Sequence, residues 1–510
     1  MDTHENTDAG TPSGDTTSAR ASAAPTLFEA SRPGRRAVVP PRSGICLAEA
    51  AIPAALRRRR ALDLPELGEL QTVRHYTRLS SLNMAIDNTF YPLGSCTMKY
   101  NPRVNEVAAA NPGFSQVHPL ASAAEAQGWL EVFARLTAAL AEISGLPHVS
   151  LQPAAGAHGE LTALMMIKAR LVERGEAATR TIVLIPDSAH GTNPSSCTIA
   201  GFATRGVRSG ADGRVDIAEL DLALGPDVAA MMITNPNTLG IFESRIEEIA
   251  RRLHRAGALL YMDGANLNAI LGVTRPGDFG VDVMHFNLHK TMSTPHGGGG
   301  PGAGPIAVAG DLEPYLPVPR IVERNGRYEL DLDRPRSIGK VRSFYGQSGI
   351  LLRALAYLMA HGPAELRGIA EHAVLNANYV RHRLQSAYHL PYATDSMHEV
   401  VFTAKKQKAA GVRALDIAKR LIDLGFHPPT IYFPLVVAEA LMIEPTETET
   451  LETLDAFCDA MLRIAEEAQR DPAKLHDAPL TQAVRRLDEV GAVKTPILTC
   501  PCAAPAEPAT

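Results

Sequence analysis

The chain has 510 residues, of which 45% are apolar and 21% charged, and its formal net charge is -5. This composition predicts a globular protein of two or more domains, and the slight acidity excludes a general attraction to nucleic acid or to an anionic membrane. No apolar stretch approaches the roughly 20 residues that span a bilayer. Six scattered cysteines without a paired CxxC spacing fit a reduced, cytoplasmic setting and offer no zinc site.

The two ends of the chain differ in composition from its middle. Residues 1–42 are rich in Ser, Thr, Ala, Pro and Gly and begin with Asp2, Glu5 and Asp8, acidic residues that targeting leaders avoid. We therefore expect a disordered tail there. Residues 43–122 predict short helices and loops, ending in a loop rich in Gly, Pro and Asn over 87–102. Residues 471–510 are expected to form a C-terminal extension.

Helical and strand patterns alternate over residues 123–339. Short apolar runs rich in β-branched residues predict strands, and long amphipathic segments between them predict helices. The alternation predicts an α/β domain with a mainly parallel sheet and helices on both faces. The expected strands are His148–Gln152, Thr181–Ile185, Ala229–Thr234, Leu259–Met262 and Val281–Phe286, and the expected helices are Glu125–Ile143, Glu160–Glu173 and Arg245–Ala256.

Residues 340–470 predict a smaller C-terminal α+β domain, because two short strands are interspersed among four helices. The expected helices are Gln347–His361, Pro363–Ser386, Ala414–Leu424 and Thr448–Gln469, and the expected strands are His398–Thr403 and Pro434–Ile443.

A turn of small residues follows the first expected strand and opens a helix. Ligands of open α/β sheets collect at the carboxyl ends of the strands. The free N–H groups of Gly156, Ala157 and His158 could hold a phosphate at the positive helix end. An ordinary strand-to-helix turn would have the same composition, and taken alone the two readings are equally compatible with it.

Single polar residues follow the next three strands. His190 stands where an imidazole could lie flat on an aromatic ring, although a lone histidine is more often structural or solvated. Asn235 could donate to a phenolic oxygen. Asp263 leaves a buried strand, and a lone aspartate there is usually a helix cap.

Lys290 stands at the exit of the last apolar strand, near histidines and a glycine-rich turn. A fixed, partly buried amine suits a Schiff base with an aldehyde cofactor. A buried structural lysine is the alternative that this run alone leaves open.

Together these residues match the needs of one cofactor, pyridoxal 5'-phosphate. Its ring requires an anion site, a stacking group, a donor to the phenolate, a carboxylate at the ring nitrogen and a lysine for the aldehyde. Asp263 would keep the ring nitrogen protonated, Ala265 is small enough to pack under the ring opposite His190, and His289 could donate to the phosphate. We expect Lys290, His190 and Asp263 to be the catalytic residues.

Five motifs resemble the glycine decarboxylase of the glycine cleavage system, the P-protein family, over residues 75–470. They are 90–100, 151–160, 188–194, 263–266, and 287–291 with 295–301. The resemblance implies the aminotransferase-like fold type I of pyridoxal-phosphate enzymes, with Lys290 as the Schiff-base lysine. It implies removal of CO2 from glycine and transfer of the aminomethyl group to the lipoyl arm of an H-protein.

Some members of this family are single chains of two homologous halves, and others are split into two subunits. This chain resembles the second half, and its 234–240 segment resembles the split form. We therefore expect the second subunit of an α2β2 heterotetramer that includes a separate subunit 1.

The loop over residues 95–100 has two possible roles. Ser95, Thr97 and Lys99 could bind the glycine carboxylate, or they could equally brace the interface between domains. His296 and the following glycines could seat a neighbouring subunit or the lipoyl arm.

Two other functions are compatible with the same site residues. An aminotransferase or another amino-acid decarboxylase of fold type I would also use Asp263 and Lys290. A non-catalytic scaffold that has lost its cofactor is the third possibility, and retention of both residues argues against it.

Overall fold

The computed structural model describes residues 25–39, 41, 44, 52–60, 62–297 and 302–498. Residues 85–476 form one compact unit, and the described residues before and after them form another. The second unit contains α1 (Leu27–Ala30), η2 (Ala54–Leu56), α2 (Glu69–Ser81) and α16 (Glu489–Lys494). The tail expected over 1–42 falls largely outside the described residues. No described helix has the length and apolar character needed to cross a membrane.

A seven-stranded sheet forms the centre of the larger unit, with the order β1-β7-β6-β5-β4-β2-β3. Its strands run parallel except β7, which is antiparallel to both neighbours. All five expected strands are present, and β3 and β7 were not expected. The bounds are β1 His148–Ser150, β2 Ile182–Pro186, β3 Ala203–Val207, β4 Val228–Thr234, β5 Leu259–Gly264, β6 Val283–Phe286 and β7 Ile306–Val308.

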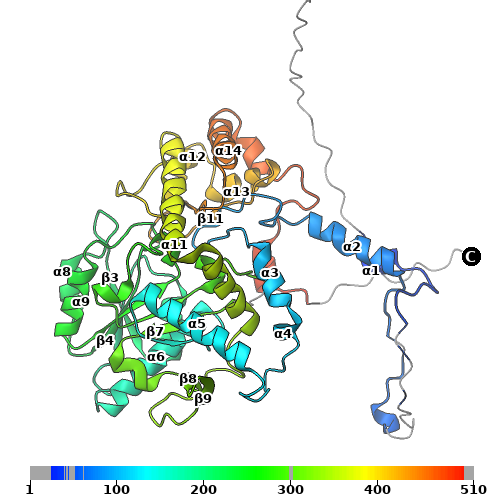
Figure 1. Ribbon diagram of the computed structural model, residues 1–510. Helices are drawn as coiled ribbons and strands as arrows, with labels where there is room; N and C mark the ends of the chain where they lie inside the picture. The colour runs from blue at the N-terminus through cyan, green and yellow to red at the C-terminus, as the bar shows by residue number, and fades with distance from the viewer. Residues whose placement is uncertain are drawn as a thin grey trace, which may run out of the picture. The chain divides into compact units, whose positions relative to one another are not determined.

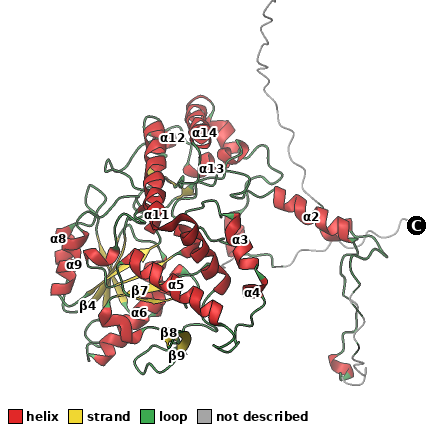
Figure 2. Cartoon of the chain, viewed as in Figure 1, coloured by secondary structure: helices red, strands yellow, loops and turns green. Residues whose placement is uncertain are grey.

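Helices cover both faces of this sheet, as expected, and Figure 2 shows the strands enclosed by them. Successive strand residues point to opposite faces, so Met231 and Met232 of β4 belong to different apolar clusters. One cluster includes α5 (Gln127–Ser144), α8 (Ile217–Ala223) and α9 (Ile246–Arg255). The other includes α6 (Gly156–Glu173) and α7 (Thr192–Ile199).

A three-stranded antiparallel sheet, ordered β10-β12-β11, forms the smaller domain with its helices (Figure 1). The strands are β10 Val400–Thr403, β11 Thr430–Ile431 and β12 Ala440–Ile443. The helices are α12 Lys405–Lys408, α13 Ala414–Asp423, α14 Leu451–Arg470 and α15 Pro472–Asp477. The boundary expected at residue 340 stays a prediction, because residues 85–476 are one compact unit.

The long helix α11 (Ser348–Leu384) is broken at Gly362, whose φ of 66° is not helical. Pro363 follows the break, so the two helices expected on either side of it are present as two segments. Leu351 and Leu355 of the first segment pack into the large-domain core, and Val380 and Leu384 of the second pack into the small-domain core.

Short elements complete this unit. The hairpin of β8 (Arg320–Arg324) and β9 (Arg327–Asp331) was not expected. The remaining helices are α3 Arg103–Ala110, α4 Pro112–Ser115 and α10 Leu288–Thr291, and the 3-10 turns are η3 Leu267–Ala269, η4 Pro276–Phe279 and η5 Gly310–Tyr315.

A carboxylate joins three helices of the small domain. Glu467 of α14 accepts hydrogen bonds from Arg420 of α13, at 2.8 and 3.0 Å, and from Lys474 of α15 at 3.1 Å. Burial opposes ionisation of Glu467, but these cations outweigh it and lower its pKa to about 2.

We expect Glu467→Gln to lower the free energy of unfolding at pH 7 by about 1–2 kcal/mol. The folded pKa lies below the ordinary value of 4.5, so the stabilisation is present above pH 4.5 and is lost as the pH falls towards 2. Urea titrations at pH 7 and pH 3 should show a deficit that shrinks in acid. Glu466→Gln, an exposed residue of α14, is the control; an equal deficit of Glu467→Gln at both pH values would contradict this account.

Candidate active site

A cavity of about 250 Å³ lies at the carboxyl ends of β4, β5 and β6, where the sequence predicted the ligand. A cavity of about 150 Å³ accepts benzene, so this one has room for a substituted aromatic ring. Of the predicted residues, Ser95, Gly156, Ala157, His190, Asp263, Ala265, His289 and Lys290 line it. The lining also includes Ala155, Glu160, Thr192, Thr234, Thr238, His285 and Asn287, which were not predicted.

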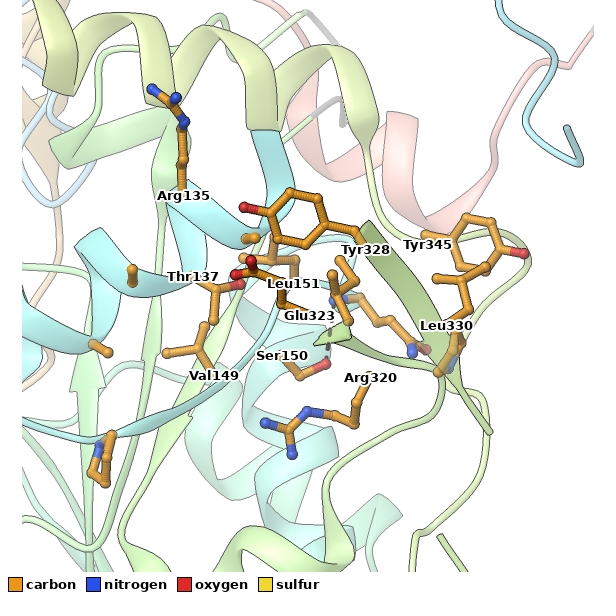
Figure 3. Close-up of a pocket in the computed structure, with 17 residues that line it drawn as sticks. Arg135, Thr137, Val149, Ser150, Leu151, Arg320, Glu323, Tyr328, Leu330 and Tyr345 are labelled. Atoms are coloured by element: carbon orange, nitrogen blue, oxygen red, sulfur yellow. Dashed lines mark hydrogen bonds between the residues drawn. The ribbon is translucent and has the colours of Figure 1, made fainter. Parts of the chain in front are cut away.

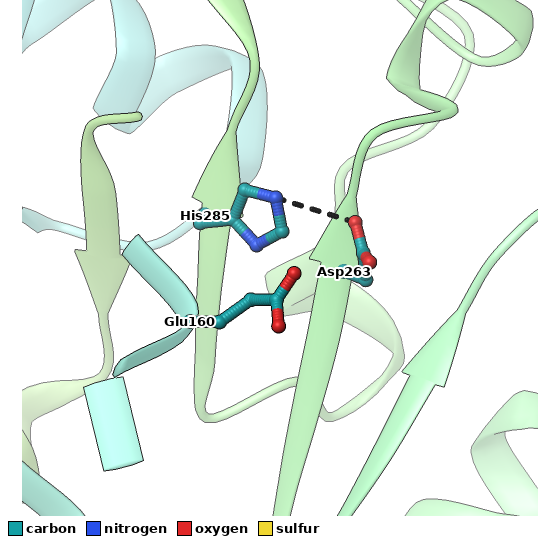
Figure 4. A group of neighbouring side chains, drawn as sticks. All are labelled: Glu160, Asp263 and His285. Carbon is teal, nitrogen blue, oxygen red and sulfur yellow. Dashed lines mark ion pairs between the residues drawn. The ribbon is translucent and has the colours of Figure 1, made fainter. Parts of the chain in front are cut away.

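Asp263 is the penultimate residue of β5, and it is buried. The sheet register sets it opposite His285 of β6, and His285 Nε2 lies 3.3 Å from Asp263 Oδ1 (Figure 4). The Ala265 N–H and the Asn193 side-chain amide donate to the carboxylate at 2.9 and 3.2 Å. Burial opposes ionisation, but His285, the Ala265 N–H and Lys290 together lower the pKa of Asp263. Asp263 is therefore ionised at neutral pH.

The tautomer of His285 follows from its second neighbour. The Tyr261 hydroxyl lies 2.5 Å from His285 Nδ1. Burial, with the nearby Glu160 and Asp263 charges, raises the pKa of Tyr261 well above its usual value, so this hydroxyl stays protonated and donates to Nδ1. The imidazole proton then resides on Nε2 and faces Asp263.

Glu160 is a site residue that the sequence analysis did not identify. It lies on the first turns of α6, and its carboxylate accepts hydrogen bonds from Thr192 and Ser196 of α7, both at 2.8 Å. Figure 4 shows it beside Asp263 and His285, with one ligand-type atom of each within 4.8 Å of the others. Because hydrogen-bond donors surround both carboxylates, the arrangement favours a hydrogen-bonded network over a metal centre. Two features of the sequence could have identified these residues: Glu160 ends the small-residue turn, and His285 lies within an apolar strand.

The small-residue turn precedes α6, and two glycines allow other parts of the chain to approach it very closely. A Cβ on Gly156 would lie 2.1 Å from Asn287 Oδ1, and a Cβ on Gly304 would lie 2.0 Å from the Ala155 carbonyl oxygen. The first N–H groups of a helix have no acceptor within it, and Gly156 and Ala157 of this first turn line the cavity. His158 does not line the cavity, because its Nδ1 accepts from the Ala154 N–H at 3.1 Å and braces the turn.

Lys290 is half-buried on α10 and reaches the cavity. Within the described part of the chain, its ammonium makes no hydrogen bond or ion pair. Its neighbour His289 is kept neutral, because burial and Lys290 lower the pKa of His289 to about 3. An unpaired amine at the cavity is the group that an aldehyde ligand requires.

His190 and Ala265 face the cavity from different strand ends. The His190 ring is exposed, its Nδ1 accepts from the Thr192 N–H at 3.2 Å, and its ring packs edge-on against Phe433. Ala265 is 8% exposed, and its methyl side chain leaves the space in front of it open. The stacking of a ring between His190 and Ala265 stays a prediction.

Asn235 is buried but does not line the cavity. Its side-chain oxygen accepts from the Glu243 N–H at 2.9 Å, which directs the amide into its own loop. Thr234 and Thr238 line the cavity instead. The expected donation from Asn235 to a phenolic oxygen is therefore not supported by this geometry.

The loop over 95–99 divides between the two roles considered for it. Ser95 lines the cavity. The Thr97 hydroxyl donates to Glu444 at 2.5 Å, and Lys99 donates to Asn268 and Glu447 at 2.8 and 2.7 Å. Thr97 and Lys99 thus brace the loop between the domains and are not free to bind a substrate carboxylate.

His296 donates to the Cys96 carbonyl oxygen at 3.1 Å and lies edge-on to His289. Burial, with Lys290, lowers the pKa of His296 to about 4, so its ring is neutral. Gly298–Gly300, part of the turn expected to seat a neighbouring subunit or the lipoyl arm, lies outside the described residues.

A second hollow, of about 440 Å³, lies between α5, β1 and the β8–β9 hairpin (Figure 3). Arg135, Arg320, Glu323, Tyr328 and Tyr345 are among the side chains around it. It shares no residue with the Lys290 cavity and is therefore a separate hollow of the same unit.

Family models and solved structures agree on the fold. Residues 369–484 match the model "Glycine dehydrogenase, C-terminal domain", and residues 169–300 match "Aminotransferase class-V". A crystal structure of glycine decarboxylase (P-protein) covers 81% of this chain and 94% of its own, with a TM-score of 0.67 and 22% identity. The cysteine desulfurase CsdA from Escherichia coli gives a TM-score of 0.57 at 15% identity over 76% of this chain and 98% of its own. The expected aminotransferase-like fold type I is confirmed.

Curated relatives are much closer in sequence. The protein named "Probable glycine dehydrogenase (decarboxylating) subunit 2" of Halalkalibacterium halodurans is 54% identical over 92% of this chain and 97% of its own length. The protein of the same name from Exiguobacterium sibiricum is 55% identical over 92% of this chain and 96% of its own. With this identity over nearly its whole length, the chain belongs to the family of glycine dehydrogenase (decarboxylating) subunit 2.

Proposed function

We propose that this chain binds pyridoxal 5'-phosphate on Lys290 and decarboxylates glycine, as the catalytic subunit of a two-subunit P-protein. The observation that carries the proposal is the unpaired Lys290 amine facing the cavity that also holds the ionised Asp263. The family membership narrows the substrate to glycine.

The buried polar groups of the cavity fit this cofactor. The Thr234 hydroxyl, the Asn287 oxygen and His289 Nδ1 belong to residues that line the cavity, and they have no hydrogen-bond partner among the described residues. Buried polar atoms without partners are costly, so they favour a polar ligand. The start of α6 would hold the phosphate, Asp263 would face the ring nitrogen, and His190 and Ala265 would enclose the ring.

The residues have separate tasks in the reaction. When bound, the cofactor supplies an aldehyde for amine exchange and a ring that withdraws electrons from the substrate. Asp263 holds the proton at the ring nitrogen, and the Nε2–H of His285 keeps Asp263 oriented and charged. Lys290 would hold the cofactor through its amine when no substrate is bound. His190 shields one face of the ring from water.

We further propose that the aminomethyl group passes to the lipoyl arm of an H-protein and that a separate subunit 1 completes an α2β2 heterotetramer. The name subunit 2 of the close relatives supports a partner subunit. We place this assembly in the cytoplasm, in keeping with the free thiols of Cys96, Cys197 and Cys458.

We expect Gly156→Ala to weaken binding of pyridoxal 5'-phosphate by at least about tenfold, because the new methyl group displaces Asn287 and distorts the start of α6. The measurement is a titration of the apoprotein followed by cofactor absorbance. Gly368→Ala, a helical position with open space around it, should leave the affinity unchanged. Equal affinity in both variants would show that the turn does not hold the phosphate.

We expect Lys290→Ala to abolish the cofactor absorbance band at roughly 420 nm and to reduce glycine decarboxylation by about a thousandfold or more. The assay follows labelled CO2 released from carboxyl-labelled glycine by the chain with subunit 1 and lipoylated H-protein. Lys340→Ala, an exposed residue, is the matched control.

The same assay separates the alternatives. Release should require lipoylated H-protein and should be fastest with subunit 1 present. Transfer of amino groups between an amino acid and a keto acid by this chain alone would instead identify an aminotransferase. A wild-type chain without the absorbance band would identify a scaffold.

A further inference from the structure

Two carboxylates of the small domain lie together in a fully buried position. Glu399 precedes β10 and Glu444 follows β12, and the pairing of Val400 with Ile443 sets the two glutamates opposite each other. Both are 0% exposed. Like charges opposite each other on neighbouring strands are unfavourable, and burial increases the repulsion because it removes the screening by water.

His398 adds a buried histidine to this pair. One atom from each of His398, Glu399 and Glu444 lies within 4.8 Å of the others. His398 is 0% exposed, and in the described part of the chain neither of its ring nitrogens has a hydrogen-bond partner, although Nε2 lies 3.8 Å from Glu444 Oε1. Burial and Lys290 lower the pKa of His398 to about 3, so it supplies no positive charge to neutralise the glutamates.

The two glutamates hold the loop that borders the cofactor cavity. Glu399 accepts from the Ser95 N–H at 2.8 Å. Glu444 accepts from the Thr97 N–H at 2.9 Å and from the Thr97 hydroxyl at 2.5 Å. Ser95 and Thr97 have φ values of 66° and 49°, which side chains with a Cβ rarely adopt. The carboxylates therefore stabilise a strained backbone conformation.

The hydrogen bonds distinguish the two glutamates. Burial raises the pKa of Glu444 as well, but the N–H and the hydroxyl of Thr97 both donate to this carboxylate, which opposes the rise and favours its ionised form. Glu399 receives the Ser95 N–H and a longer contact of 3.4 Å from the Asn266 amide. Burial and the neighbouring Glu444 raise the pKa of Glu399 well above its usual value. Glu399 is thus the carboxyl group that takes the proton.

The loop that the two glutamates hold places the Ser95 hydroxyl at the cavity. Ser95 lines the same cavity as Lys290, and within the described part of the chain its hydroxyl makes no hydrogen bond. Asn266, which also contacts Glu399, follows Ala265 of the ring site by one residue. The pair therefore connects the small domain to both sides of the cavity.

We propose that Glu399 and Glu444 are positioning residues that carry one proton and one negative charge between them. They hold the Ser95–Thr97 loop so that the Ser95 hydroxyl binds the carboxylate of the amino-acid substrate. This inference rests on the proposed glycine chemistry and assigns the glutamates no contact with substrate.

The test compares Glu399→Gln, Glu444→Gln, Glu399→Ala and Ser95→Ala, each in the complex of the chain with subunit 1 and bound pyridoxal 5'-phosphate. Glycine is titrated while the cofactor absorbance is followed, and KM and kcat are measured separately. Glutamine imitates a protonated glutamate, so Glu399→Gln should keep the glycine affinity within about threefold of wild type. Glu444→Gln, Glu399→Ala and Ser95→Ala should each raise KM by at least about tenfold and retain the cofactor band.

Glu439→Gln is the matched control. This half-buried carboxylate also accepts a backbone N–H, that of Ala414 at 3.0 Å, but it does not contact the loop. Its KM should equal that of wild type. Retention of the cofactor band in each variant separates a misplaced loop from an unfolded site.

Three outcomes would overturn the inference. If Glu399→Gln raised KM as much as Glu399→Ala, Glu399 would have to be ionised. An unchanged KM in Glu444→Gln or Ser95→Ala would show that the loop does not bind substrate. If glycine does not change the cofactor absorbance of the wild-type complex, both the proposed function and this inference are wrong. If glycine changes the wild-type absorbance but the variants have the KM of wild type, only this inference is wrong.

Discussion

The negative charge of Asp263 is the feature on which the rest of the site depends. A carboxylate enclosed by protein is costly to keep ionised. Here the cost is offset by His285 from the adjacent strand, by the Asn193 amide from α7 and by the Ala265 N–H. Each of these groups is placed by the sheet register or by a helix at its edge. The charge can therefore persist only when the large domain is completely packed.

The sequence predicted which residues lie at the ends of the strands, near the cavity. It did not predict which way their side chains point. Asp263 and Lys290 line the cavity as predicted, because strand ends in a parallel sheet share one edge. Thr97 and Lys99 were ambiguous because their partners Glu444 and Glu447 lie 347 and 348 residues along the chain. His158 and Asn235 do not line the cavity, because each side chain accepts a hydrogen bond from a nearby backbone N–H group instead.

The missed strands have a similar physical explanation. β3 is an edge strand with a largely exposed burial pattern, so its sequence carries little apolar signal. β7 has only three residues, too few for a periodic pattern. β7 nevertheless matters for the site, because it leads directly from Gly304, whose missing side chain lets the chain touch the turn before α6.

The loop over residues 93–99 is attached to both domains at once. Gly94 lies so close to β12 that a Cβ there would be 2.1 Å from Met442, and the next residues are held by Glu399 and Glu444. Lys99, at the other end, donates both to Asn268 of the large domain and to Glu447, which follows β12 of the small domain. Rotation of the small domain about the break at Gly362 would move Ser95 together with Glu399, and it would separate the two partners of Lys99. A rotation of the small domain would therefore displace the Ser95 hydroxyl within the cavity that Lys290 also lines.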